Sequence, residues 1–453
     1  MSFRNLVEEM GVTRALAHQA RRIKWQEIGE DAREVARHCL LDFLGVGLAG
    51  TSEPLVKILV DSVVRGEGSS QASLIGRKER ATELTAALVN GAAVHALDFD
   101  DTHLTLNGHP SVPVLSALLP LCESSTVSGE QLLEAVVAGV EFECRLAAIM
   151  GLKHYTAGFH ATGTLGTFGA AAACAQLLHL DEQQWLNTLG LAGTQAAGLK
   201  SGFGTMAKPL HAGRAGSAGL LSAKLAAAGF TANPGIVEVA QGFAATHCGE
   251  PLEFEEIDSA RQFEICGTLF KYHAACYLTH AAIEAAASIR AQHSPQPDAV
   301  SSIEALVSPV ILGVCNIPRP STGLEGKFSI RTMIAAALLG YNTGDPALFT
   351  DAQMNEPRLV ALRDRVTITP VEDRPESRVK VLVQTRNGRF EAEADSGEPA
   401  TDLAGQRERL LRKFNALATP VLGASQARSL ADAALGADRA PQARQIIRMA
   451  TLA

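Results

Sequence analysis

The 453-residue chain has few aromatic and few charged residues, and these shortages exclude several classes of protein. Aromatic residues make up 5% of the sequence and charged residues 19%. The formal net charge is −8, and no long run of lysine and arginine is present. A nucleic-acid-binding protein needs a basic surface and aromatic side chains on which bases can stack. The composition therefore predicts no nucleic-acid partner.

Long apolar runs and closely spaced cysteine pairs are also missing. Each apolar stretch is interrupted before it reaches about 18 residues, so we expect no membrane-spanning helix. The start of the chain has no apolar core followed by a cleavage site, so we expect no secretory signal. The cysteines contain no CxxC pair, which argues against a disulfide framework, a zinc knuckle and an iron–sulfur cluster. Together these features predict a cytoplasmic protein with reduced thiols at Cys39, Cys122, Cys144, Cys174, Cys248, Cys266, Cys276 and Cys315.

Helical patterns fill the chain from its start to about residue 269. Apolar residues recur at three- and four-residue steps in several segments, and Ser128 and Gln131 have the spacing of a capping box. Small residues at helical spacing allow helices to approach closely, so residues 1–269 should form one large all-helical domain. The expected helices cover 31–50, 82–98, 128–151, 163–178, 181–199 and the residues after 208.

The pattern changes after about residue 270. Segment 300–315 reads as a strand, and segment 378–395 alternates apolar and polar side chains around Asn387-Gly388, a pair typical of a type I′ hairpin turn. We expect a smaller α+β domain over residues 270–400, while the helical tail 401–453 completes the first domain. The predicted fold class is therefore mainly α with an α+β second domain. A cleft between two such domains is a common place for a small-molecule site.

The stretch HALDFDDTH, which starts at His95, concentrates three aspartates and two histidines in nine positions. If the preceding helix continues through it, His95, Asp98 and Thr102 share one face. Asp100 and Asp101 then point elsewhere, and they either cap the next segment or support the site from behind, as partners of nearby histidines and lysines. A solvated helix end, a metal site and part of a catalytic pocket are the alternatives. The regular ligand spacings of calcium loops and zinc sites are absent, so we expect no metal here.

Three further segments place histidine or lysine in loops or at helix ends. His109 lies between a glycine and a proline, and His160 directly precedes a glycine-rich helix. Pro209 fits the first turn of a helix, which puts Lys208 at the N-terminal end, where free N–H groups and the lysine favour a bound carboxylate. Lys271 stands at the domain boundary, where a cation could close on a bound anion. An ordinary structural role is the alternative for each of these residues.

Four segments occur in an order that resembles one enzyme family. They are NGAAVHALDFDDTH, GFHATGTLGTFGAAAA, KPLHAGRAGSAGLLSAKLAAAGF and KYHAACYLTHAAIEAA. In these motifs the chain is similar to the MmgE/PrpD family, which includes 2-methylcitrate dehydratases, cis-aconitate decarboxylases and an epimerase acting on iminodisuccinate. The resemblance implies a large all-helical domain with a smaller α+β lid domain and a homodimer. It also implies a small di- or tricarboxylate substrate and chemistry without a metal or organic cofactor.

The family's reactions make or protonate a carbanion-like centre beside a carboxylate. Such a step requires an acid–base residue tuned near neutral pH and cations that stabilise the developing charge. By resemblance, His160 transfers a proton opposite Tyr155 or His109, and Lys208 and Lys271 bind carboxylates. The full set implied by the resemblance is His160, Lys208, His109, Tyr155 and Asp98 as catalytic residues, with Thr102, Lys271, His103 and Cys276 as substrate-binding residues.

Two departures from the decarboxylase branch guide the choice of reaction. Where that branch is expected to have a histidine and a tyrosine, this chain has Cys276 and Val314. Both differences argue against decarboxylation. Because dehydratases are frequent in the family, we expect a hydro-lyase similar to 2-methylcitrate dehydratase. The alternative is an epimerase of an amino-dicarboxylate such as iminodisuccinate, with Tyr155 and Lys208 on opposite faces of the α-carbon. A decarboxylase similar to the cis-aconitate enzymes and a non-catalytic scaffold are weaker hypotheses.

Overall fold

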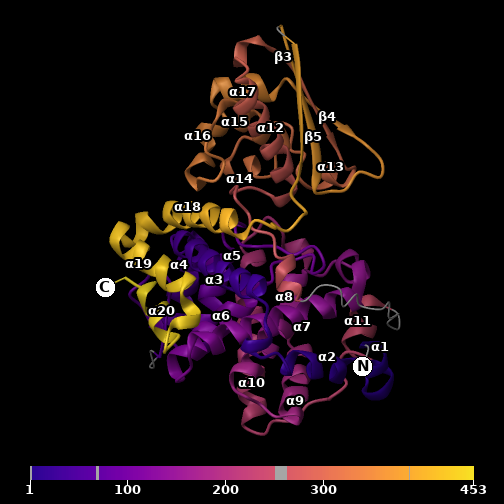
Figure 1. The fold of residues 1–453 in the computed structure, drawn as a ribbon, viewed down its shortest axis with the longest axis vertical. Helices are drawn as coiled ribbons and strands as arrows, with labels where there is room; N and C mark the ends of the chain where they lie inside the picture. Colours follow the sequence, from indigo (N-terminus) through magenta and orange to yellow (C-terminus); the bar gives the residue numbers. More distant parts are fainter. Residues whose placement is uncertain (1–2, 68–70, 250–262, 387, 453) are drawn as a thin grey trace. The chain divides into compact units, whose positions relative to one another are not determined.

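The chain folds into two compact units in a computed structural model (Figure 1). The first unit is Met1–Phe270 with Ala400–Ala453, and the second is Lys271–Pro399. Helices dominate the first unit, whereas the second combines helices with a four-stranded sheet, which confirms the predicted fold class. The residues that the structure describes are 3–67, 71–249, 263–386 and 388–452.

Helix α8 (Ala161–Leu177) lies at the centre of the first unit, and every one of its residues is buried. It packs against α6 (Ser111–Ser124), α7 (Gly129–Thr156) and α10 (Ala207–Ala227), and α10 also packs along α5 (Glu83–His95). Glycine and alanine make up much of α8, so neighbouring helices can approach it closely from several sides. This arrangement surrounds the N-terminal end of α8, which begins directly after His160, with other helices of the unit.

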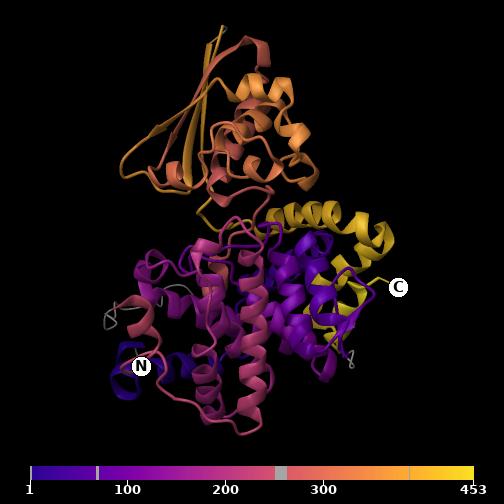
Figure 2. The same ribbon diagram turned by 180° about the vertical axis from the view of Figure 1, so that it is seen from behind.

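The remaining elements of the first unit surround this centre (Figures 1 and 2). They are α1 (Phe3–Met10), α2 (Val12–Arg21), η1 (Trp25–Glu27), α3 (Glu30–Gly50), α4 (Pro54–Leu59), the π-helical turn η2 (Val60–Val64), β1 (Ala72–Ser73), β2 (Arg80–Ala81), α9 (Glu182–Gly193), η3 (Lys200–Gly202), α11 (Phe243–Cys248), η4 (Glu264–Gly267), α18 (Leu403–Leu422), α19 (Ala424–Leu435), η8 (Ala437–Arg439) and α20 (Arg444–Met449). The capping box of Ser128 and Gln131 at the start of α7 is confirmed.

The C-terminal segment is tied to the body of the first unit by a buried lysine. Helix α18 packs along α3. The Nζ atom of Lys413 donates to Asp42 Oδ1 at 2.6 Å and to the carbonyl oxygen of Phe99 at 2.7 Å. Phe99 belongs to the HALDFDDTH stretch, so residues from the two ends of the chain together hold this stretch in place.

Helices α5 and α10 cross in unusually close contact, and this crossing fixes the two elements that carry His95 and Lys208. A Cβ atom on Gly213 would lie 2.0 Å from the carbonyl oxygen of Leu88, and a Cβ atom on Gly91 would lie 2.7 Å from Gly213 Cα. No side chain fits at either position unless the two backbones separate, which explains why both residues are glycine.

Gly213→Ala is expected to destabilise the protein by about 2 kcal/mol, because the added methyl group must push α5 and α10 apart. Urea unfolding followed by circular dichroism measures this loss. Gly66→Ala is the control, because a Cβ atom at Gly66 meets nothing within 4 Å. Equal stability of the two variants would contradict the close crossing.

A carboxyl group of α7 lies in the core without a hydrogen-bond partner. Glu143 is fully buried, and neither of its carboxyl oxygens is hydrogen-bonded within the described part of the chain. A Cβ atom on Gly169 would lie 2.5 Å from Oε2, so the carboxyl group sits directly against α8. Burial, with a smaller contribution from the negative charge of Asp101, raises the pKa of Glu143 well above its usual range and favours the neutral acid.

Compared with the wild type, Glu143→Gln is expected to have a higher free energy of unfolding at pH 8, and the difference should be smaller at pH 5. The pKa of Glu143 in the folded protein lies above the ordinary value of 4.5. Its contribution to stability is therefore complete below about pH 4.5 and is lost as the pH rises through the raised pKa. Glutamine keeps the shape and carries no charge, so the variant should lack this loss. Urea unfolding at both pH values measures the effect, and Glu130→Gln, an exposed site on the same helix, should leave the pH dependence unchanged.

The second unit contains a mixed sheet with strand order β4–β3–β5–β6. Strand β3 (Val300–Val307) is parallel to β4 (Val366–Pro370) and antiparallel to β5 (Arg378–Thr385), which pairs antiparallel with β6 (Gly388–Asp395). Helices cover one face of this sheet (Figure 1). The helices and turns of the unit are η5 (Tyr277–Thr279), α12 (His280–His293), η6 (Pro297–Ala299), α13 (Val310–Val314), α14 (Gly323–Gly326), α15 (Ile330–Leu339), η7 (Pro346–Leu348), α16 (Asp351–Met354) and α17 (Pro357–Arg363).

Two strand predictions have different outcomes. The single strand expected over 300–315 is wrong in its second half, because β3 ends at Val307 and Pro309 starts the short helix α13. Proline has no N–H group for a strand ladder, which accounts for the end of the strand there. The hairpin is confirmed by the pairing of Thr385 with Gly388, while Asn387 lies outside the described residues.

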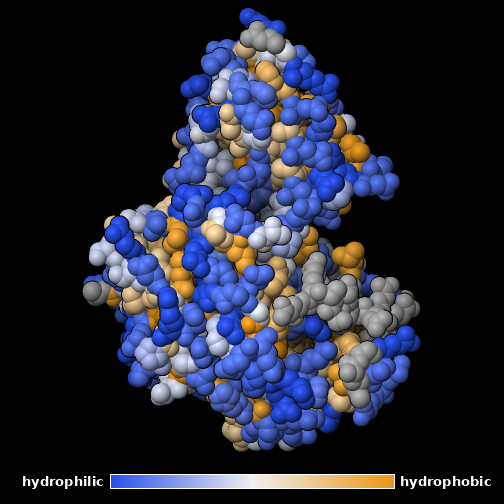
Figure 3. All heavy atoms as spheres, in the orientation of Figure 1, coloured by the Kyte–Doolittle hydropathy of each residue, from blue (hydrophilic) through white to orange (hydrophobic). Residues whose placement is uncertain are grey.

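The surface of each unit is mainly hydrophilic on the face drawn in Figure 3. No single helix within the described ranges is long and apolar enough to cross a membrane. The pair Glu30–Gly50 and Pro54–Val64 meets the length and composition requirements together, but it bends by 80°. All eight cysteines are free thiols, six of them buried.

Candidate active site

The HALDFDDTH stretch leaves helix α5 instead of extending it. The helix ends at His95, and Asp98 has a φ of 53°, in the left-handed region. The predicted shared helical face of His95, Asp98 and Thr102 is therefore wrong. The reason is a tertiary contact, because the N–H and C=O groups of Thr102 pair with those of Leu269, each at 2.8 Å. This pairing holds the stretch as a loop against a distant segment of the chain.

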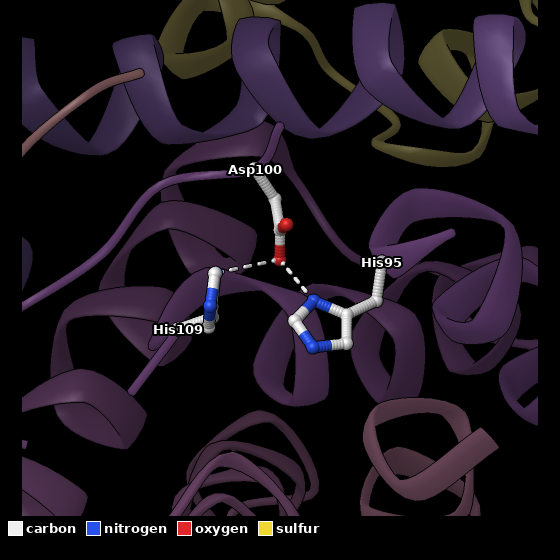
Figure 4. A group of neighbouring side chains, drawn as sticks. All are labelled: His95, Asp100 and His109. Carbon is white, nitrogen blue, oxygen red and sulfur yellow. Dashed lines mark hydrogen bonds and ion pairs between the residues drawn. The ribbon is translucent and has the colours of Figure 1, made fainter. Parts of the chain in front are cut away.

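The two central aspartates of this loop do different things. Asp101 accepts hydrogen bonds from the backbone N–H of Ser111 at 3.3 Å and from the Ser111 hydroxyl, so it caps α6 as predicted. Of the two roles that the sequence left open for Asp100, the structure shows the supporting one. Its Oδ2 atom lies 2.9 Å from Nδ1 of His95 and 3.2 Å from Nδ1 of His109 (Figure 4). The carboxylate is thus a partner of two histidines, as the charge of the stretch indicated.

The contacts of Asp100 determine its charge. Burial alone would raise the pKa of Asp100, but the charges and hydrogen bonds of His109 and His95 hold it well below its usual range. An ionised carboxylate only accepts hydrogen bonds, so His95 must donate from Nδ1. The rings of His95 and His109 meet edge to face, with centroids 4.4 Å apart.

His95, Asp100 and His109 form a group with three atoms that could ligate a metal ion, and these atoms lie within 4.8 Å of one another. The separations of 2.9 and 3.2 Å are also those of directly paired side chains. His95 is hydrogen-bonded to this buried carboxylate oxygen, and His109 is ion-paired with it. A structural zinc site has four protein ligands, whereas a catalytic zinc site has three and a position for water or substrate. We call the three side chains a triad, joined by one hydrogen bond and one ion pair.

Asp98 connects this triad to a lysine. The Nζ atom of Lys208 donates to Asp98 Oδ1 at 2.7 Å, and Nε2 of His109 lies 3.6 Å from the same oxygen. Lys208 is the second residue of α10, as the prediction of a helix N-terminus required. The side chains of Lys208 and Asp98 are 17% and 24% exposed, so a small solute can reach them. The N–H groups of Ala207 and Lys208 are hydrogen-bonded to Thr205, so the predicted free N–H groups are not found there. The dipole of α10 still adds positive potential at this point.

His160 lies at the other side of the same cluster. It is the residue before α8 and is 2% exposed. Its Nδ1 atom lies 3.2 Å from Nδ1 of His211, and its ring stacks against that of His95 with centroids 5.7 Å apart. Burial, followed by the positive charges of His95, Lys208 and other nearby cations, lowers the pKa of His160 well below its usual range. His160 is therefore a neutral imidazole at neutral pH.

Sequence reasoning missed His211 and the specific pairing of Asp100 with His95 and His109. His211 follows Lys208 by three residues on α10, so helical spacing alone placed both on one face. Burial lowers the pKa of His211, with a smaller effect of His95. No comparable signal marked Asp100, because its partner His109 approaches from a separate loop. The cluster that results consists of His95, Asp98, Asp100, His109, His160, Lys208 and His211.

Three other predicted site residues make contacts that stabilise loops. The hydroxyl of Thr102 donates to the carbonyl of Gly108 at 3.1 Å. His103 Nε2 lies 2.9 Å from the carbonyl oxygen of Glu264. The Nζ atom of Lys200 lies over the ring of Tyr155, 3.5 Å from its centroid, and donates to the Tyr155 carbonyl oxygen at 3.2 Å. Their predicted roles in catalysis and substrate binding remain predictions.

The last two predicted residues belong to the second unit. Lys271 is 1% exposed and Cys276 is 7% exposed. The N–H of Cys276 donates to the carbonyl of Lys327 at 2.9 Å. Val314, at the end of α13, is 46% exposed. The substrate-binding roles of Lys271 and Cys276 remain predictions.

The cluster in the first unit combines the components of acid–base catalysis. His160 is neutral, whereas His109 lies between two carboxylates that favour its cationic form. Two histidines whose surroundings favour opposite protonation states can act as base and acid. Lys208 at the start of α10 adds a partly exposed positive charge beside these histidines, and its predicted role in binding a substrate carboxylate remains a prediction.

A mainly helical unit with such a cluster, joined to an α+β unit, defines a two-domain protein suited to acid–base chemistry. The chain belongs to the MmgE/PrpD family. The model of the MmgE/PrpD N-terminal domain matches residues 14–255, and that of the MmgE/PrpD C-terminal domain matches residues 273–438. All members of the histidine–aspartate–lysine cluster lie within the first match.

The chain is similar to named enzymes of two kinds. It is 30% identical over 383 residues to the cis-aconitate decarboxylase of Mus musculus, covering 81% of this chain and 77% of the relative. The cis-aconitate decarboxylase of Aspergillus terreus is 26% identical and covers 95% of this chain and 94% of its own length. The 2-methylcitrate dehydratase of Escherichia coli (strain K12) is 28% identical over 186 residues, or 38% of this chain and 37% of the relative. These similarities place the chain among enzymes.

Proposed function

We propose that the chain is a lyase that removes water from a small hydroxy di- or tricarboxylate. The observation that carries the proposal is the contrast between two neighbouring histidines. His160 is buried among cations and neutral, whereas His109 lies 3.6 Å from Asp98 and 3.2 Å from Asp100. Dehydration needs such a pair, because a proton leaves carbon while another proton reaches the departing hydroxyl.

Each step of the proposed reaction has a residue suited to it. His160 takes the proton from the carbon beside a carboxylate, and the C–H electron pair moves toward that carboxylate. Lys208 binds the carboxylate and stabilises the added charge. His109 gives a proton to the hydroxyl, the C–O bond breaks, and water leaves with formation of the C=C bond. Carboxylate binding by Lys271, which the family resemblance implies, remains a prediction.

Decarboxylation is the second candidate, because the relatives that span most of the chain are named cis-aconitate decarboxylases. In that reaction CO₂ leaves, and a histidine of the cluster protonates the remaining carbanion. The residues at positions 276 and 314, a cysteine and a valine, favour dehydration over this reaction. Epimerisation of an amino-dicarboxylate uses the same proton abstraction with reprotonation from the opposite face. The homodimer and the cytoplasmic location remain predictions.

One experiment separates these reactions. The protein is incubated in D₂O with citrate-like hydroxy acids, cis-aconitate and aspartate-like acids, and the mixtures are followed by NMR. An alkene formed from a hydroxy acid, or water added to cis-aconitate, supports the proposal. Loss of CO₂ supports the decarboxylase, and α-deuteration with racemisation but no alkene supports the epimerase. No reaction with any acid of the panel would contradict the proposed lyase.

A further inference from the structure

We propose that Asp100 and His95 are positioning residues, which hold the His109 imidazole with Nδ1 toward the protein and Nε2 toward Asp98 and the substrate. The catalytic meaning of this inference rests on the proposed function. Its structural part, the tautomer and orientation of His109, can be measured without any substrate. The two parts can therefore fail separately.

The first argument is the geometry of a single carboxylate oxygen. Asp100 is 2% exposed, and its Oδ2 atom is approached by Nδ1 of His95 at 2.9 Å and by Nδ1 of His109 at 3.2 Å. Figure 4 shows the carboxylate between the two rings. Its other oxygen, Oδ1, has no hydrogen-bond partner within the described residues. The polar contacts of this buried carboxylate therefore concentrate on the two imidazoles.

The second argument concerns which nitrogen carries the proton. Because an ionised carboxylate only accepts, His95 must donate from Nδ1. The Nδ1 atom of His109 lies 3.2 Å from the same oxygen in an ion-pair contact without hydrogen-bond geometry, and the negative charge favours a proton on this nitrogen. In neutral His109 the proton is then on Nδ1, and Nε2 is the nitrogen that binds and releases the exchangeable proton. Nε2 lies on the side of Asp98 and Lys208, where the substrate carboxylate is proposed to bind. Fixing the tautomer in this way is how a buried aspartate supports a catalytic histidine in serine proteases.

The third argument is the rigidity of the supports. His95 is the last residue of α5, and its ring contacts both His109 and His160. The backbone N–H of His109 donates to Thr162 Oγ1 at 3.0 Å, which ties its loop to the start of α8. His109 is therefore held through its backbone and its ring. The titratable groups that face it are His95, Asp98, Asp100, His160 and, through Asp98, Lys208.

The decisive test is NMR of the full chain with ¹⁵N-labelled histidine, without substrate. In the wild type, His109 should show a protonated Nδ1 when neutral and should titrate at Nε2. In Asp100→Asn, the pH at which His109 loses its proton should fall by at least one unit, and its tautomers should mix. Asp101→Asn is the matched control, a neighbouring buried aspartate whose carboxylate contacts Ser111, and it should leave His109 unchanged. His109→Asn identifies the resonance.

Several results would overturn the inference. One is a neutral His109 that carries its proton on Nε2 in the wild type. Another is a His109 spectrum that is the same in Asp100→Asn and in Asp101→Asn. Tight binding of one equivalent of Zn²⁺ that shifts both His95 and His109 would instead make the triad a metal site. If Asp100→Asn fails to fold, the wild-type spectrum and the spectrum of His95→Gln still test the inference. In His95→Gln both tautomers of neutral His109 should be populated.

Activity gives a second readout, measured with cis-aconitate hydration or with whichever hydroxy acid of the panel reacts. Asp100→Asn should lower kcat about 10²-fold with KM changed less than about threefold, and Asp100→Glu should restore part of the loss. A large rise in KM with unchanged kcat would contradict a positioning role. If the NMR result holds and no acid reacts, the proposed function fails while the arrangement of the triad stands.

Discussion

Replacement of Lys208 by alanine is expected to lower kcat/KM about 10²- to 10³-fold, the cost of removing a preorganised charge that stabilises a developing anion. The Nζ atom of Lys208 lies 2.7 Å from Asp98 in the structure. Its position at the N-terminal end of α10 adds the positive potential of the helix start to its own charge. Steady-state kinetics with the substrate identified in the D₂O panel measures the loss.

A double variant separates catalysis from local charge balance. Asp98→Asn alone is the reference, because Asp98 also contacts His109. If Lys208 serves only to neutralise Asp98, the double variant Asp98→Asn with Lys208→Ala should be as active as Asp98→Asn. If Lys208 binds the substrate carboxylate, the double variant should be slower than Asp98→Asn by about 10²-fold. Lys208→Arg keeps the charge and should retain more activity than the alanine variant, although its planar group is larger. Equal rates of the double variant and Asp98→Asn would contradict the proposed role.

Replacement of His160 by asparagine should lower kcat about 10³-fold with little change in KM, because proton abstraction depends on this imidazole while binding does not. The pKa of His160 lies well below its usual range, and a base must be deprotonated to act. The wild-type kcat should therefore stay level as the pH falls below 6.5 and decline only in more acidic solution. The asparagine variant should lack this acidic decline.

His211→Asn is the matched control for His160. The two Nδ1 atoms are 3.2 Å apart, so both variants remove one member of the same histidine contact. If His160 is the base, His211→Asn should cost less than about tenfold in kcat. Equal losses, or a larger loss at His211, would contradict the assignment of the base.

The sequence predicted those features that depend on neighbouring residues. Ser128 and Gln131 cap α7 as their spacing indicated, and Lys208 lies in the first turn of α10 as Pro209 indicated. Asp101 caps α6 because its partner Ser111 follows closely in the chain. In each case the determining contact lies within ten residues or fewer, so a local pattern contains the information.

The role of Asp100 could not be predicted in this way. It depends on the end of α5 at His95, and on a loop that is held by the pairing of Thr102 with Leu269. The charge of the stretch indicated histidine partners, but helical spacing did not say which aspartate meets which histidine. The contacts of Asp100 with His95 and His109 required the three-dimensional arrangement.

The buried lysine of the C-terminal segment has a consequence for biosynthesis. A ribosome makes Asp42 and Phe99 early, but it makes Lys413 only after the whole second unit, Lys271–Pro399. The first unit cannot complete its core during synthesis of its own N-terminal part, whereas the second unit is contiguous and has all its residues before Lys413 emerges. Removing one partner of a buried ion pair costs about 3–5 kcal/mol. The loop that carries Asp98 and Asp100 thus acquires this support only after the second unit has been made, and nascent or truncated chains that stop before α18 lack it.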